Sequence, residues 1–253
     1  MFRTRFFFSL LSFSVVVLAW EMVTRFSGWS GQVFPSPSTV FTSMIELIAN
    51  GELLKHTVAS LFRVTAGFYL AVILGIPLGI ILGRVKIAKL LFNPLVQFLR
   101  PISPLAWIPL AMLWFGIGDV PAVFLIFLSS FFPLVVSTSV AVESIKPTYF
   151  QVASNFNFSR YEVLTKIIIP AITPNVIIAL RLTITIAWLV VVAAEMIAVQ
   201  SGLGYMILDS RNALRMDYVM VAMIVIGIIG LLLDVIMQAL GNIESTAWGR
   251  LSK

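Results

Sequence analysis

Residue types that could carry out acid–base or nucleophilic chemistry are scarce in this sequence of 253 residues. Cysteine is absent and histidine occurs once, at His56, which excludes a thiol nucleophile and a histidine metal cluster within one chain. Neither G-x-S-x-G nor H-E-x-x-H occurs, and no glycine precedes a lysine, as the phosphate-binding loop of an ATPase requires. A carboxylate dyad of Glu195 and Asp234 is the remaining option for an intramembrane enzyme. The sequence therefore lacks obvious residues for catalysis.

Arg181 and Glu195 are the most prominent charges within apolar sequence. Charged side chains there are costly and usually face a cavity or a partner. About 21 Å of straight helix would separate the two, so they do not pair directly. Arg181 either lines a route through the protein or its gate, or extends its charge to the membrane surface. Glu195 either lines that route or its gate, or pairs with a neighbouring helix at the outer interface. Trp107, Trp114 and Trp188 either line the route or anchor span ends at the interface.

The stretch S-G-L-G-Y at 201–205 predicts a tight turn, with Gly202 and Gly204 in unusual backbone conformations. The loop that follows has mixed charge, and it either receives a partner protein or is simply solvated. Its charged residues are Asp209, Arg211, Arg215 and Asp217.

The composition places these residues in a multi-span membrane protein. Hydrophobic residues make up 60% of the chain, charged residues 11%, and the mean hydropathy is +1.04. A crossing needs roughly 20 apolar residues, and we predict an all-α fold with six spans in a single transmembrane domain over 1–253. The predicted spans are about 6–26, 57–83, 94–116, 120–142, 170–198 and 216–240. The third contains four prolines that break or kink a helix, and such backbone is typical of a segment that lines a pathway.

The first predicted span, 6–26, resembles a secretory signal but lacks a small-x-small cleavage site, so we expect it to be retained. Six spans place both termini on one side of the membrane. Positive charge favours the cytoplasm for that side, and the net charge of +6 reflects basic loops rather than nucleic-acid binding. The residues that carry this bias are Arg3, Arg5, Arg84, Lys86, Lys89, Lys146, Arg160, Lys166, Arg250 and Lys253.

The outer, periplasmic loop 27–56 contains F-P-S-P-S-T, which predicts a short helix capped by Ser38 and ended by Asn50-Gly51. We expect this helix to lie on the outer membrane interface. Its apolar residues are Val40, Ile45, Leu47 and Ile48.

Within the predicted core bundle, 57–245, the second span carries Gly75, Gly79 and Gly83 on one helix face. Small residues at this spacing allow backbones to approach closely. We expect this face to pack within the bundle, although a self-dimerisation face is the alternative.

A polar dodecapeptide, Q-V-A-S-N-F-N-F-S-R-Y-E at 151–162, interrupts the apolar sequence. Pro147 suits the first turn of a helix that leads into it. Asn157 tolerates the left-handed conformation that ends a helix, and Ser159 with Glu162 forms a capping-box pattern that begins the next one. We therefore predict a cytoplasmic helix–turn–helix over 147–166 that continues into a span near Pro170. On this pattern alone it is either a solvated loop or a docking element.

The dodecapeptide resembles the coupling motif of ATP-binding-cassette importer permeases, E-A-A-x-x-x-G followed by I-x-L-P. Gln151, Val152 and Ala153 stand at E-A-A, Asn157 at the glycine, and I-I-I-P (167–170) at the end. Gln151 removes a negative charge, whereas Asn157 preserves the turn. Further stretches are similar to the nitrate, sulfonate, taurine and bicarbonate class, and the resemblance spans about 30–245. They are F-P-S-P-S (34–38), G-E-L-L-K-H (51–56), S-L-F-R-V-T-A-G-F (60–68), R-P-I-S-P-L-A-W-I-P-L (100–110), W-F-G-I-G (114–118) and A-E-M-I-A-V-Q-S-G-L-G-Y (194–205).

This resemblance implies a type I importer permease fold and a permease dimer, homo- or heteromeric, in the bacterial inner membrane. It also implies two cytoplasmic ATPase subunits that bind ATP and Mg, an external solute-binding protein, and no cofactor on this chain. The implied solute is a small oxyanion. Other solutes such as a thiamine precursor, or a stand-alone secondary transporter, are the alternatives. The implied coupling residues are Gln151, Val152, Ala153, Ser154, Asn155, Phe156, Asn157, Phe158, Ser159 and Arg160.

Overall fold

The computed structural model describes residues 2–26, 28, 31 and 33–248. Every regular element within these ranges is a helix. Arg250 and Lys253, used above to predict orientation, lie outside the described residues, as do four positions of the predicted loop 27–56. The structure gives the helical course of the segment that carries Arg3 and Arg5 but not the placement of those side chains.

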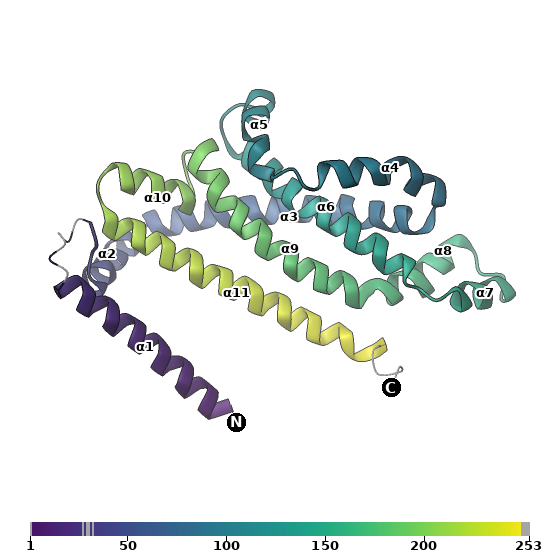
Figure 1. The fold of residues 1–253 in the computed structure, drawn as a ribbon, viewed down its shortest axis with the longest axis horizontal. Helices are drawn as coiled ribbons and strands as arrows, with labels where there is room; N and C mark the ends of the chain where they lie inside the picture. Colours follow the sequence, from purple (N-terminus) through teal and green to yellow (C-terminus); the bar gives the residue numbers. More distant parts are fainter. Residues whose placement is uncertain (1, 27, 29–30, 32, 249–253) are drawn as a thin grey trace.

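Long helices occupy five of the six predicted spans. They are α1 (Phe2–Phe26), α3 (Glu52–Arg84), α6 (Asp119–Glu143), α9 (Ile169–Ala198) and α11 (Met216–Trp248). Length and apolar composition qualify four stretches of the described residues as membrane spans: α3, α6, α11 and the continuous helix from Arg160 to Ala198. Figure 1 shows these helices side by side.

The third predicted span, 94–116, differs from the prediction. A helix already begins at Lys86, and α4 (Lys86–Leu99) meets a second helical stretch at an angle of 89°. That stretch consists of η1 (Pro104–Trp107) and α5 (Ile108–Phe115). Pro101 and Pro104 flank the bend, and each lacks the N–H that a continuing helix would need. The predicted break is confirmed, and the helical segment begins at Lys86, earlier than the predicted bound of 94. The two bent halves together have the length and composition of one broken span or a re-entrant loop.

α3 and α6 pack closely along a row of glycines on α3. A Cβ on Gly79 would lie 2.6 Å from Thr138 Cβ, and one on Gly83 would lie 2.7 Å from the carbonyl oxygen of Ser139. Gly67 lies about two helical turns before Gly75 and packs against Ile126 in the same way. The expected packing face is confirmed, and it is used within the chain.

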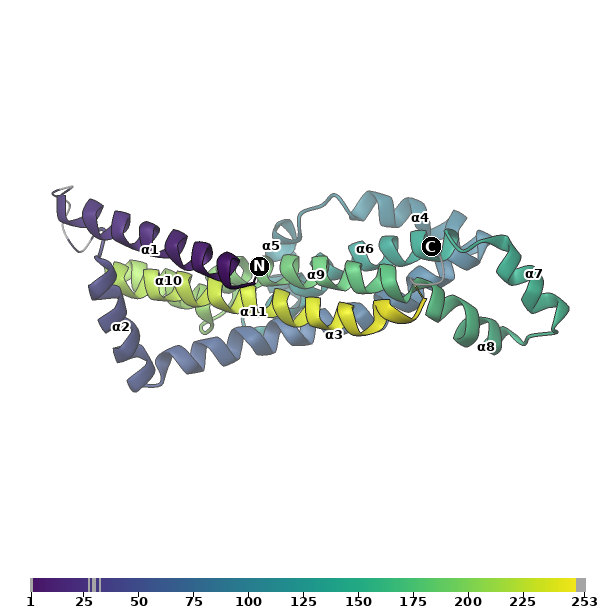
Figure 2. The ribbon, with the colours of Figure 1, turned by 90° about the horizontal axis from the view of Figure 1, so that it is seen from below.

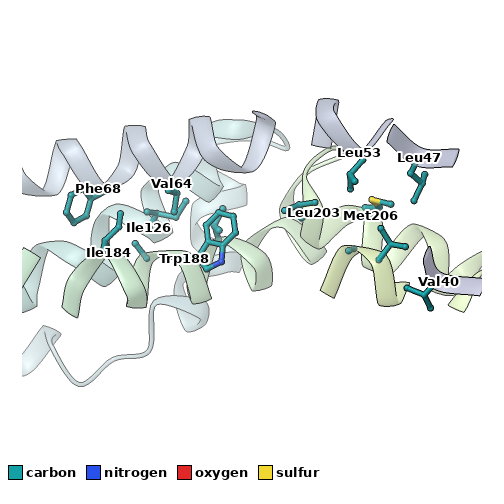
Figure 3. Packing of buried hydrophobic residues seen from close by; sticks show 14 residues of the cluster. Val40, Leu47, Leu53, Val64, Phe68, Ile126, Ile184, Trp188, Leu203 and Met206 are labelled. Atoms are coloured by element: carbon teal, nitrogen blue, oxygen red, sulfur yellow. The ribbon is translucent and has the colours of Figure 1, made fainter. Parts of the chain in front are cut away.

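One large apolar cluster runs from the middle of the bundle to one end. Phe68 and Val64 of α3 face Ile184 and Trp188 of α9, as Figure 3 shows. At the end of the bundle the cluster continues through α2 (Pro37–Ala49) and α10 (Leu203–Asn212). Figures 1 and 2 place α2 and α10 at one end and α7 (Pro147–Asn155) and α8 (Arg160–Val163) at the other.

The short helix α2 differs from the prediction at its start. Ser36, not Ser38, is the N-cap: its hydroxyl accepts a hydrogen bond from the backbone N–H of Thr39, and Pro37 takes the first helical position. Asn50 ends the helix, and Gly51 follows with a φ of 78°, as expected. One face of α2 packs against the bundle. Val40, Ser43 and Leu47 are buried, whereas Ile45 and Ile48 remain exposed.

Candidate functional site

The segment 147–163, called the elbow from here on, consists of α7, a tight turn and α8. Pro147 occupies the first turn of α7. Asn157 has a φ of 53°, which confirms the predicted left-handed turn. Two backbone hydrogen bonds close it, from Phe158 N to Ala153 O at 2.9 Å and from Asn157 N to Ser154 O at 3.0 Å. This pairing satisfies carbonyls at the end of α7 and fixes the direction of the chain.

The predicted capping box begins α8. Ser159 Oγ accepts from Glu162 N at 3.2 Å, and Glu162 Oε2 accepts from Ser159 N at 2.9 Å. Lys166 Nζ donates to Glu162 Oε1 at 2.8 Å. This hydrogen bond, together with those from Ser159, lowers the pKa of Glu162 to about 2. The carboxylate therefore stays ionised at physiological pH, and the turn keeps its shape.

A π-helical turn, η2 (Leu164–Ile168), joins α8 to α9 without interruption. The sequence did not reveal this turn. The helix from Arg160 to Ala198 has 39 residues, which is about 58 Å, whereas the hydrocarbon core is about 30 Å thick. This helix is therefore longer than the hydrocarbon core is thick, and the elbow joins a span without a break.

The elbow presents aromatic side chains to its surroundings. Phe156 is 72% exposed and Tyr161 is 74% exposed, while Ala153 is buried. The guanidinium of Arg84, at the end of α3, lies 4.0 Å from the ring centre of Phe150, which ties α7 to the bundle. Of the coupling residues predicted from the sequence, most are exposed on this surface: Gln151, Val152, Ser154, Asn155, Phe156, Asn157, Ser159 and Arg160.

At the opposite end of the bundle, Arg63 of α3 and Glu195 of α9 form an ion pair, called the enclosed pair below. Arg63 Nη1 lies 2.6 Å from Glu195 Oε1, and the two side chains are 2% and 0% exposed. Glu195 Oε2 also accepts from Ser60 Oγ at 2.8 Å and from Gly204 N at 2.9 Å. The carboxylate of Glu195 therefore lies against the neighbouring helix α3, and both of its oxygens accept hydrogen bonds.

The same arginine joins two further segments. Arg63 Nε donates to Asp119 Oδ1 at 2.8 Å, at the start of α6, and Nη1 donates to Ser201 O at 2.8 Å. Gly202 has a φ of 105°, as predicted for the turn. Gly204 instead lies in α10 with an ordinary helical backbone, so that part of the prediction was wrong. It is small because a Cβ there would collide with the carbonyl oxygen of Val192.

Arg181 of α9 and Asp234 of α11 form a second ion pair, called the half-open pair below. The contact is bidentate: Nε to Oδ1 at 2.7 Å and Nη2 to Oδ2 at 2.8 Å. The side chains are 41% and 40% exposed. Arg181 and Glu195 each have a separate partner, as their separation along α9 required, and Asp234 and Glu195 form no dyad.

The three predicted tryptophans are not brought together. Trp188 is buried, and its Nε1 donates to Ile226 O of α11 at 3.0 Å. Trp107 and Trp114 lie on η1 and α5 with ring centres 6.4 Å apart, and Trp114 is exposed. Trp188 therefore connects two spans, whereas the other two lie on the broken span.

Two residues of the outer charged loop fasten α2 to α11. Asp217 accepts from Ser43 Oγ at 2.7 Å and from Arg215 Nη2 at 2.8 Å. The hydrogen bond to Asp217 raises the pKa of Arg215. Across the described residues, no three histidine or acidic side chains are arranged to hold a metal ion.

Sequence reasoning missed the partners Arg63 and Asp234. Each is an opposite charge within or at the end of another span, at a depth that matches its partner. This match in depth between opposite charges is the sequence signal that could have identified the two pairs.

The fold and the elbow define a multi-pass helical membrane protein with a rigid helix–turn–helix projecting from one end. The chain belongs to the family described as "Binding-protein-dependent transport system inner membrane component", whose model matches residues 75–243. It is therefore a membrane component of such a transport system.

Relatives along nearly the whole chain agree with this assignment. A probable ABC transporter permease protein of Brucella melitensis is 39% identical over 91% of this chain and 93% of the relative. The taurine transport system permease protein TauC of Escherichia coli is 32% identical over 95% and 89%. The nitrate import permease protein NrtB of Synechocystis is 34% identical over 88% and 84%. A solved structure of the MetNI methionine ABC transporter in inward-facing conformations shares the fold, with a TM-score of 0.59, 15% identity, and coverage of 78% of this chain and 97% of that one.

Proposed function

We propose that this chain is the permease subunit of an ATP-driven importer and forms part of the pathway for a small oxyanion. Two permease subunits, identical or related, would assemble with two ATPase subunits and a solute-binding protein on the far side of the membrane. The observation that carries the proposal is the elbow. It is a capped, exposed helix–turn–helix that continues into α9 without a break, so a force on the elbow is transmitted to a span.

ATP and Mg²⁺ belong to the partner subunits in this proposal. The sequence has no G-x-x-x-x-G-K-[ST] loop. Closure of the ATPases would move the elbow, and the bundle would rock between inward-facing and outward-facing states. This chain itself then catalyses no reaction.

The charge distribution supports an orientation in the bacterial inner membrane with the elbow and both termini in the cytoplasm. Basic residues gather at the elbow end of the bundle: Arg84, Lys86, Lys89, Lys146, Arg160 and Lys166. Few acidic residues share that end. Glu143 pairs with Lys89 at 2.8 Å, and Glu162 pairs with Lys166.

Relatives named for aliphatic sulfonate, taurine, nitrate and bicarbonate transport support an oxyanion as the solute. The external binding protein would select among such solutes. Arg181 is the basic residue placed well inside a described span with part of its side chain open, which fits an anionic or zwitterionic cargo.

The decisive experiment reconstitutes the chain with its ATPase and binding protein in proteoliposomes and compares Asn157→Val with Asn157→Gly. Valine resists a positive φ, so Asn157→Val is expected to hydrolyse ATP with little or no uptake, whereas Asn157→Gly transports normally. Normal uptake by Asn157→Val would remove the role of the turn. Uptake at full rate by the chain alone, without an ATPase, would refute the proposal.

Docking is tested separately. Replacing residues 150–158 by a Gly/Ser linker is expected to abolish co-purification of the ATPase. Unchanged recovery of the ATPase would place its docking surface elsewhere.

A further inference from the structure

The half-open pair occupies an unusual position for two charges. Arg181 and Asp234 lie well inside α9 and α11, and both side chains are about two-fifths exposed. Exposed apolar residues surround them, Ile178 and Leu182 on α9 and Val235 on α11. Ionised side chains within spans face a water-filled route or another protein rather than lipid, because the hydrocarbon offers them no hydrogen bonds. The face that carries the pair therefore borders such a route or another protein.

The geometry of the pair leaves donors unused. The bidentate contact engages Nε and Nη2 of Arg181. Within the described residues Nη1 has no hydrogen-bond partner, so its two N–H groups are free. Arg63 differs: Nε, Nη1 and Nη2 all donate to protein oxygens. Arg181 alone of the two can take a further acceptor.

We infer that the half-open pair is an anion contact on the translocation pathway. Nη1 of Arg181 donates to an oxygen of the passing solute, and Asp234 is the positioning residue that holds the guanidinium in place. This inference rests on the proposed function and deepens it.

The carboxylate of Asp234 also sets the strength and selectivity of the contact. A lone arginine inside a membrane would bind an anion too tightly to release it, whereas conduction needs binding weak enough to leave. Asp234 cancels most of the positive charge and repels a second negative charge near the site. The contact therefore suits a solute with one acidic group, such as a monoanion or a zwitterion, and disfavours a dianion such as sulfate.

The test uses the complete complex in proteoliposomes, with nitrate, bicarbonate, methanesulfonate and taurine as probes; uptake is followed for those that its binding protein binds. Arg181→Met with Asp234→Leu keeps the net charge and approximate volume. We expect uptake to fall by about tenfold, the loss of one charge-assisted contact, while ATP hydrolysis stimulated by the binding protein stays within about twofold. The matched control removes an exposed pair on α1, Arg25 and Glu21 at 2.7 Å, with Arg25→Met and Glu21→Leu, and is expected to transport normally.

Two results would overturn the inference. One is unchanged uptake by the double variant. The other is equal loss of uptake, ATP hydrolysis and assembly, which is the signature of a structural pair. Absence of uptake by the wild-type complex would instead refute the proposed function itself.

A second variant, Asp234→Asn, tests the role of Asp234 directly. Asp234→Asn leaves Arg181 positive, so we expect a lower KM, a lower kcat and inhibition by sulfate that the wild type lacks. The same KM, kcat and sulfate response as the wild type would contradict the role given to Asp234.

Discussion

The enclosed pair and the half-open pair contain the same chemical groups at nearly the same separation, 2.6 Å and 2.7 Å, yet their surroundings are opposite. Arg63 and Glu195 are shut away from solvent, and every donor and acceptor around them is matched. Arg181 and Asp234 are partly exposed, and Arg181 has unused N–H donors. Both pairs join two helices, but only the half-open pair has donors available for the solute contact inferred above.

A third pair completes the series. Lys166 and Glu162, called the elbow pair, lie one turn apart on the helix that follows the turn, and their side chains are 56% and 37% exposed. The half-open pair and the elbow pair are thus similarly exposed, whereas the enclosed pair is buried. The enclosed pair should therefore contribute most to stability, because an isolated charge is costly only where water cannot reach it.

Arg63→Met is the change with the largest expected effect. It leaves the Glu195 carboxylate buried beside Ser60 without its countercharge, and such losses cost about 3–5 kcal/mol of unfolding free energy. Denaturation of the purified protein in detergent would measure it. A drop no larger than that of an exposed substitution would show that the enclosed pair is not structural.

The double variant Arg63→Met with Glu195→Leu isolates the cause. Removing both charges should recover much of the lost stability, since an apolar pair of similar volume is often as stable as a buried ion pair. A double variant as unstable as Arg63→Met alone would instead assign the cost to the hydrogen bonds of Arg63 with Ser201 and Asp119.

Arg181→Met tests the same comparison at the half-open pair. Asp234 is partly open, so its unpaired carboxylate can be hydrated, and the unfolding midpoint should fall clearly less than for Arg63→Met. The same denaturation measurement applies. Equal shifts in the unfolding midpoint of Arg181→Met and Arg63→Met would mean that both pairs are structural.

The smallest effect is expected at the elbow pair and concerns pH. The folded pKa of Glu162 is about 2, below its ordinary value of 4.5, so its stabilising contacts are complete above about pH 4.5 and disappear as the pH falls through about 2. The elbow should be unchanged between pH 6 and 8. Lys166→Met should raise the pKa of Glu162 towards its ordinary value, as NMR titration of the carboxyl carbon would detect; an unshifted pKa would contradict this account.

Local patterns predicted the parts of the fold that depend on neighbouring residues. The turn at Asn157, the capping box of Ser159 and Glu162 and the glycine row on α3 follow from steric limits and hydrogen-bonding capacity within a few residues. The local structure of the elbow could therefore be predicted from the sequence almost completely.

Partners across the bundle could not be predicted in this way. Pairing Arg63 with Glu195, and Arg181 with Asp234, depends on which helices pack together and on their relative rotation. The bend after Leu99 was expected as a break, but its angle and the early start of α4 depend on packing that prolines alone do not specify. The N-cap of α2 was misplaced because Ser36 and Ser38 flank the same proline, and both are acceptable caps.

The π turn at Leu164–Ile168 gives the elbow a particular azimuth around the axis of α9. A π turn accommodates one residue more than an α-helical turn, so deleting a single residue there would convert it to ordinary helix. Each residue of an α-helix advances the chain by about 100°. Because the π turn already absorbs the extra residue, that deletion would leave the orientation of Phe156 nearly unchanged. A one-residue deletion in the regular helix after Ile168 would instead rotate Phe156 by more than a quarter turn relative to the other membrane helices, and would turn its exposed ring away from a partner groove on the original side.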